Sequence, residues 1–255
     1  MLNWEALTLF LLINMRMTGF VVLNPLIGRR GTPGVVQAGI IMVLSVTVFS
    51  IWSGGVAMPA TLLELALRLL LEFVLGYILG LAVNIFLYIP LLAGGMVDVQ
   101  MGMSMGSTYD PGSQSSITVT AHILNALMIL LFFAANGHHT LFRILLTSGE
   151  LVPFGAVRLP PHLASVMVEL FAACSVLGVK LCMPILMAEV LGQIGMGILM
   201  KVIPQINVFA INIELKVILG LLLLLVLMAP ISEFLLAAEN QMLAELQRLL
   251  ALAGG

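Results

Sequence analysis

Long apolar runs restrict what this chain can fold into more than any other feature of its sequence. About six runs approach or exceed 20 residues, the length at which a helix crosses the hydrocarbon core of a bilayer. We place them at residues 6–27, 35–58, 69–93, 122–146, 164–191 and 206–231. Apolar residues make up 61% of the 255 residues and charged residues only 9%, which is far from a soluble composition. The sequence therefore predicts an all-α, polytopic membrane protein.

The segments between these runs are short and contain Gly or Pro, as at residues 28–34, 147–163 and 201–205. Pro lacks a backbone N–H and Gly tolerates positive φ, so both end or bend helices. We therefore expect broken or hairpin helices within a single domain that covers residues 1–255. Residues 232–252 have apolar side chains at helical spacing with charges between them, which predicts an amphipathic C-terminal helix.

One connection is long and unusual in composition. Gly, Ser and Met are frequent between Gly94 and Thr120, and a loop of this length in an apolar protein is typically functional or disordered. Methionine side chains are flexible and can repack around different shapes, so an adaptable seal is one interpretation. A solvated loop with incidental methionines is the other. The candidate residues of this loop, 98–120, are Met101, Gly102, Met103, Met105, Tyr109, Asp110 and Pro111.

Charged residues within or beside the apolar runs are the next candidates, because an unpaired ion is costly in lipid. They are Arg16, Glu72, Glu169, Lys180, Glu189, Glu214 and Lys216. Within one helix, Glu169 and Lys180 would be about 16 Å apart, too far to pair, and Glu214 and Lys216 diverge at i and i+2. Their partners must lie on other helices, on other subunits or in water. A proton relay, subunit contacts and structural pairing inside the chain all remain possible.

A repeat of four residues marks one side of the third run. Glu72, Gly76, Gly80 and Asn84 follow one slowly drifting stripe of a helix. Two glycines at this spacing let helix backbones approach closely in lipid. Because the stripe also carries Glu72 and Asn84, we expect it to face protein rather than lipid.

The order of several short motifs is more specific than any one of them. Along the chain come the Glu72 stripe, Asp98-x-Gln100-x-Gly102, Asp110–Pro111, Asn136–Gly137–His138, Pro204–Gln205-x-Asn207-x-Phe209 and Lys216. This order, over about residues 5–235, resembles the FliR/SctT family of type III secretion export-gate proteins. Its Asn136–Gly137–His138 turn is more similar to the flagellar branch than to the virulence branch.

The resemblance implies a core subunit of the flagellar export apparatus in the bacterial inner membrane. Such a subunit would form, with FliP and FliQ, a gated conduit for unfolded export substrates, with FlhB and FlhA as neighbours and without catalysis. Residues 102–116 would plug the conduit. The resemblance also implies subunit-contact or buried polar roles for the charged residues above and for Asp98, Gln100, Pro204, Gln205 and Asn207.

Three other interpretations stay open. The first is an injectisome export-gate subunit, and the second is an independent secondary transporter with Glu72, Glu169 and Lys180 along an ion path. The third is a membrane scaffold. A transporter would carry an internal repeat, and we find no convincing one.

We expect no cofactor and no metal, because the four histidines lack ligand spacing. Cys174 and Cys182 would be about 12 Å apart in a helix, too far for a disulfide, and are expected to be small packing residues.

Overall fold

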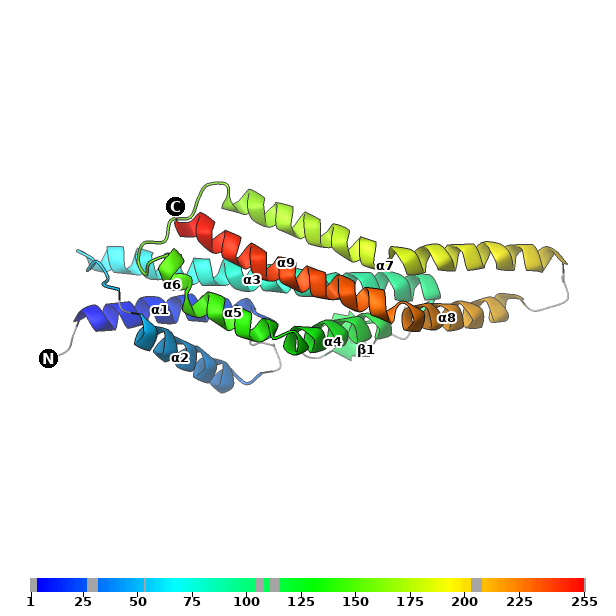
Figure 1. The fold of residues 1–255 in the computed structure, drawn as a ribbon, viewed down its shortest axis with the longest axis horizontal. Helices are drawn as coiled ribbons and strands as arrows, with labels where there is room; N and C mark the ends of the chain where they lie inside the picture. The colour runs from blue at the N-terminus through cyan, green and yellow to red at the C-terminus, as the bar shows by residue number, and fades with distance from the viewer. Residues whose placement is uncertain are drawn as a thin grey trace. The chain divides into compact units, whose positions relative to one another are not determined.

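The computed structural model describes residues 4–26, 32–52, 54–103, 108–110, 115–202 and 208–254. Helices make up most of this part of the chain (Figure 1), which confirms the predicted all-α fold class. The elements are α1 (Trp4–Leu23), α2 (Gly34–Ile51), α3 (Leu62–Met101), β1 (Thr108–Asp110), β2 (Ser115–Ile117), α4 (Val119–Ala134), α5 (Gly137–Leu146), α6 (Ser148–Leu151), α7 (Leu163–Val202), α8 (Val208–Val226) and α9 (Met228–Gly254). The short antiparallel pair β1–β2 was not predicted.

Two helices are much longer than the runs predicted for them. α3 and α7 each contain 40 residues and continue through Pro90 and Pro184. Helices in lipid tolerate such prolines because neighbouring groups satisfy the freed backbone carbonyls. α3 also runs on to Met101, so Asp98 and Gln100 are helical rather than part of the loop.

The predicted run 122–146 is divided instead into α4 and α5, which meet at an angle of 68°. Asn136 stands between them with a φ of 58°, the left-handed conformation that asparagine adopts more readily than most residues. Four of the described helices are long and apolar enough to cross a membrane, or up to six spans if each bent helix pair counts as one. The second bent pair is Glu214–Val226 with α9. The chain is therefore a multi-pass membrane protein.

The chain divides into two compact units. Unit 1 comprises residues 1–86, 136–171 and 239–255, and unit 2 comprises residues 87–135 and 172–238. In unit 1 the core lies where α1 packs against the first part of α3, with Leu12, Met17 and Phe20 of α1 fully buried. α2 adds to α1 through an edge-to-face contact between Phe10 and Phe49, whose ring centroids are 5.9 Å apart.

Close backbone contact also organises unit 2. A Cβ on Gly94 of α3 would collide with the backbone of Ala121 in α4, so the two helices approach as closely as glycine permits. A Cβ on Gly178 of α7 would come within 2.9 Å of Leu92. Cys182 of α7 is buried beside Met96, with the sulfur atoms 3.8 Å apart, and Cys174 is also buried. These contacts pack α4 and α7 against the C-terminal part of α3.

Candidate functional sites

A buried ion pair joins α1 to α3 in unit 1. The guanidinium of Arg16 donates from Nε to Glu72 Oε2 at 2.6 Å and from Nη2 to Glu72 Oε1 at 3.1 Å. Both side chains are completely buried. An isolated buried charge is strongly unfavourable, whereas a bidentate pair satisfies both groups. Arg16 and Glu72 therefore need each other in this fold.

The same pair fastens the segment that follows α5. Arg16 also donates to Ser148 Oγ at 3.1 Å and to the carbonyl of Val152 at 2.9 Å, while the N–H of Gly155 donates to Glu72 Oε1 at 2.7 Å. Gly155 has a φ of 83°, a conformation that favours glycine. These bonds hold residues 148–155 against α1 and α3.

Aromatic rings close one side of this network. The Arg16 guanidinium carbon lies 4.2 Å from the centre of the Phe154 ring, a cation–π contact. Trp52 meets the same ring edge-to-face at 5.2 Å. We call Arg16, Glu72, Ser148, Val152, Phe154 and Gly155 the buried clamp.

The four-residue stripe of α3 lies along α1 for its whole length. A Cβ on Gly76 would overlap the Arg16 carbonyl, and one on Gly80 would approach the Phe20 carbonyl to 2.6 Å. At the end of the stripe, Asn84 Nδ2 donates to the carbonyl of Leu23 at 3.3 Å. The stripe thus faces protein, and its glycines permit the backbone approach that brings Glu72 to Arg16.

The base of the 98–120 loop is fixed in unit 2. The Asp98 carboxylate, fully buried, accepts from the backbone N–H of Thr120 at 2.8 Å and from its hydroxyl at 2.5 Å. It thereby satisfies an N–H in the first turn of α4, where the helix dipole also favours an anion. The two ends of the loop are joined directly below it.

Met101 anchors the same base from the α3 side. Its side chain is fully buried, and a Cβ on Gly220 of α8 would come within 2.5 Å of its methyl carbon. Gly102 follows with a φ of 77° and ends the helix, and Met103 is half-buried. Met101 is thus a packing residue at the foot of the loop, while Gly102 turns the chain out of α3.

The tip of the loop is described only in its backbone. Tyr109 pairs with Ser116 and Asp110 with Ser115 in the β1–β2 ladder, which makes this part a hairpin. Of the other predicted residues, Met105, Pro111, Pro204, Gln205 and Asn207 lie outside the described residues.

The remaining charged candidates differ in burial. Glu189 of α7 is 1% exposed, and neither carboxylate oxygen has a hydrogen-bond partner among the described residues. Lys216 of α8 is half-buried and close enough to interact electrostatically with Glu189. Glu169, Lys180 and Glu214 are exposed, and Gln100 is half-buried. The structure does not bring these exposed residues into the buried clamp or to the loop base.

Sequence reasoning missed several residues that complete the two sites, and it missed one further buried carboxylate. Ser148, Phe154 and Gly155 are ordinary residues of a Gly/Pro-containing connection, and Ser148 is 132 positions from Arg16. Thr120 was treated as the end of a loop, but it lies in the first turn of α4 and donates its backbone N–H and its hydroxyl to Asp98. Glu239, 3% exposed in α9 with no hydrogen-bond partner for Oε1 in the described part of the chain, was read as a charge of an amphipathic helix.

The fold and the two sites define the class of this protein. It is a multi-pass helical membrane protein in which the buried clamp holds one connection and a second, longer loop is fixed at its base. The sequence profile of the family described as "Bacterial export proteins, family 1" matches residues 7–242, and the chain belongs to this family. Among curated relatives, it is 26% identical to the flagellar biosynthetic protein FliR of Bacillus subtilis, over 96% of this chain and 95% of that protein. It is 25% identical to FliR of Escherichia coli (96% and 94%) and 24% identical to FliR of Caulobacter vibrioides (87% and 88%).

Proposed function

We propose that this chain is a core subunit of the flagellar type III protein export apparatus. It forms, with FliP and FliQ, the gated conduit through the bacterial inner membrane for unfolded export substrates, with FlhB and FlhA as neighbours. Membership of the bacterial export family and similarity to FliR proteins over nearly the whole chain support this role. The subunit supplies a passage and a gate, not catalysis.

The fixed base of the 98–120 loop is the observation that supports a gating role for this loop. Asp98 joins the two ends of the loop through Thr120, and Met101 packs beside Gly220. A loop held this way can change its tip without separating the helices that present it. The closed conduit is sealed by the segment 102–116, and substrates pass when that segment yields.

Methionines supply the deformable part of the seal. Met101 is buried in the base, so this role falls to Met103 and Met105, whose flexible thioethers adapt to irregular gaps. Asp110–Pro111 would fix the turn at the tip. Replacing both Met103 and Met105 by Gly should raise ion leak through a reconstituted assembly. The matched variant with Leu at both positions retains apolar volume and should leak no more than the original.

The buried charges favour this role over an independent transporter. Glu72 is bonded to Arg16 and Gly155 and has no exposed surface, so in this fold it serves packing rather than an aqueous ion path. The candidates for contact with other subunits are Glu189, Lys216, Glu169, Lys180 and Glu214.

Co-expression is the direct test. The chain is purified through its own tag together with FliP and FliQ, and the intact complex is weighed by native mass spectrometry. A discrete mixed complex supports the export-gate role. A monomer or homodimer, with both partners well expressed, would contradict this role and support the hypothesis of an independent transporter. Complementation distinguishes the flagellar from the virulence role. The chain is expressed in a strain that lacks FliR and in one that lacks the injectisome counterpart, and the restored function is compared.

A further inference from the structure

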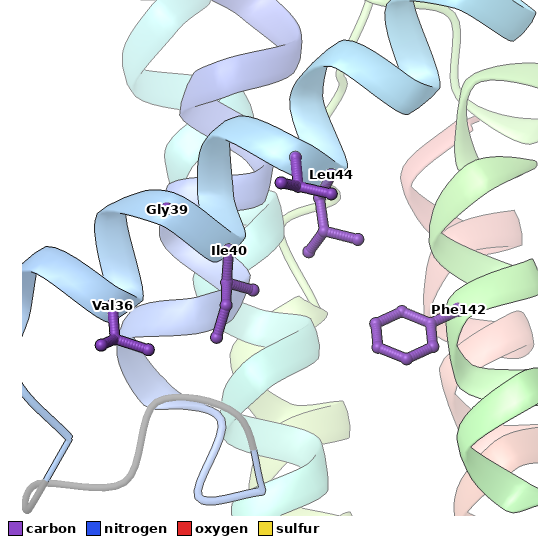
Figure 2. A pocket seen from close by; sticks show the side chains of 6 residues that line it. Val36, Gly39, Ile40, Leu44 and Phe142 are labelled. Atoms are coloured by element: carbon purple, nitrogen blue, oxygen red, sulfur yellow. The ribbon is translucent and has the colours of Figure 1, made fainter.

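The connection that follows α5 is contacted by two different parts of unit 1. α5, whose Phe142 faces an apolar pocket on α2 (Figure 2), leads through α6 into residues 148–158. Arg16 and Glu72 of the buried clamp bond to this connection, and we call that its inner side. The last turn of α9, which also belongs to unit 1, contacts the same connection, and we call that its outer side.

Close backbone contact joins the last turn of α9 to the connection. The N–H of Arg158 donates to the carbonyl of Ala253 at 3.2 Å, and so satisfies one of the carbonyls that a helix leaves free at its C-terminal end. A Cβ on Gly254 would come within 2.5 Å of the Leu151 carbonyl oxygen, an approach that only glycine permits. Ala253 is fully buried, although α9 ends one residue later. The end of α9 is therefore docked on the connection.

The backbone at Val152 places the two contacts on opposite sides of one short segment. Val152 has a φ of −129° and a ψ of 93°, and in such an extended chain successive carbonyls point in roughly opposite directions. The Val152 carbonyl accepts from Arg16, whereas the preceding carbonyl, that of Leu151, lies against Gly254. Displacement of the end of α9 would therefore remove one wall from residues that bond to the ion pair.

The contact on the outer side is the weaker of the two. In the part of the chain that the structure describes, it has one backbone hydrogen bond, whereas three hydrogen bonds join the connection to Arg16 and Glu72. The terminal turns of helices also open at a lower free energy than the core of a protein does. The last turn of α9 is therefore the part of this arrangement that is released first.

We propose that the last turn of α9, residues 251–254, is a latch on the buried clamp. When docked, it holds residues 151–158 against the ion pair and keeps water from Arg16 and Glu72. When released, it lets the connection move away and both charges become hydrated. A partner that binds the released end of α9 would shift the equilibrium toward the open clamp. The latch is a property of the chain itself and is independent of the proposed export role.

Hydrogen exchange of the full-length chain in bicelles tests the latch. Gly254→Leu puts a side chain where the Leu151 carbonyl lies, so the last turn must move. The N–H of Gly155, bonded to Glu72 on the inner side, should then exchange about fivefold faster, the size expected for the loss of one hydrogen bond. Ala251→Leu, at an exposed position of the same turn, is the matched control and should change nothing.

The position of the change decides the outcome of this comparison. Faster exchange of the Arg158 N–H alone, with Gly155 unchanged, would show that the end of α9 moves without opening the clamp, and would overturn the proposal. Equal exchange at Gly155 in the Gly254→Leu and Ala251→Leu variants would overturn it as well.

The reverse experiment starts from the inner side. Ser148→Ala removes one bond to Arg16 and leaves the residues of α9 unchanged. Because a coupling free energy is the same in both directions, the N–H groups of residues 250–254 should exchange faster. Ser165→Ala, which removes a surface hydroxyl bonded to a backbone carbonyl, is the matched control and should leave that end unchanged. An effect of Ser148→Ala confined to the connection would contradict the coupling.

The double variant separates coupling from two local effects. If the latch and the clamp open together, Gly254→Leu already releases the connection, and adding Ser148→Ala should raise the exchange of Gly155 by less than its own factor. Factors that simply multiply would refute the proposal. These measurements use the chain without partners, so their outcome is separate from the test of the export role.

Discussion

Loss of the Glu72 charge should destabilise unit 1 far more than loss of any exposed carboxylate. Glu72 accepts three hydrogen bonds, two from Arg16 and one from the N–H of Gly155. Glu72→Gln conserves shape and creates no cavity, but it places an amide NH₂ where a carboxylate met donors. The buried guanidinium then has no counter-charge in the clamp.

The size of the effect follows from that geometry. Removing one partner of a buried ion pair costs about 3–5 kcal/mol, because the other charge stays desolvated. Arg16 retains its bonds to Ser148 and to the Val152 carbonyl and its contact with Phe154, which offset part of this cost. We therefore expect about 3 kcal/mol, the lower end of the range, or more than a hundredfold in the folding equilibrium.

Trp52 provides a local reporter for the measurement. Its ring packs on Phe154, which in turn lies over the Arg16 guanidinium. In a Trp4→Phe background Trp52 is the remaining tryptophan, so its fluorescence during denaturant titration in bicelles follows this region. The loss should appear as a lower midpoint with an unchanged slope.

Glu64→Gln is the matched control, since Glu64 lies on the same helix and pairs with Arg68 near the surface. It should leave the midpoint unchanged, because exposed pairs contribute little. The double variant Arg16→Met with Glu72→Met should recover much of the loss by removing both charges. A Glu72→Gln midpoint equal to that of Glu64→Gln, or a double variant whose losses simply add, would refute the reasoning.

Other parts of the structure give further expectations. Asp98→Ala leaves the buried N–H of Thr120 without its acceptor and should cost about 1–3 kcal/mol, seen as faster amide hydrogen exchange at the start of α4; unchanged exchange would show that the loop base is held otherwise. Gly76→Ala should lower the denaturation midpoint, because its Cβ overlaps the α1 backbone, whereas Gly95→Ala on the same helix meets nothing and should raise stability by up to about 1 kcal/mol. Equal midpoints for the two variants would contradict the close packing of α1 on α3. The Cys182 thiol, buried beside Met96, should react with a maleimide only after denaturation, and rapid labelling of the folded protein would argue against this burial.

Local sequence patterns were enough to predict the all-α class and the membrane environment of the chain. Runs of apolar residues gave the membrane class and the approximate places of the helices, since length and hydropathy are properties of adjacent residues. The stripe from Glu72 to Asn84 was expected to face protein because helical periodicity places its members on one side. Helix ends were less accurate: α3 extends eight residues beyond the predicted run 69–93, and the angle at Asn136 is not expressed in hydropathy.

The sequence could not predict which helices and side chains contact each other within the chain, and the reason is physical. A helix that is apolar all round carries no pattern that marks its buried face, so nothing local says which helix will pack on which. The possible partners of Arg16 therefore included other subunits and water, and the fold selected Glu72, 56 residues away, together with Ser148. Met101 was grouped with the loop methionines until the fold placed it in the core beside Gly220.

The sequence by itself determined that this chain is a multi-pass helical protein of the membrane, because the free energy of burying about 20 apolar residues in lipid depends only on composition and length. The tertiary structure alone decided which charges are neutralised within the chain and how the 98–120 loop is held. Those outcomes depend on contacts between residues far apart in the chain, made possible by glycine positions where two backbones meet. Only folding reveals such contacts, because each is stable only once the others have brought its helices together.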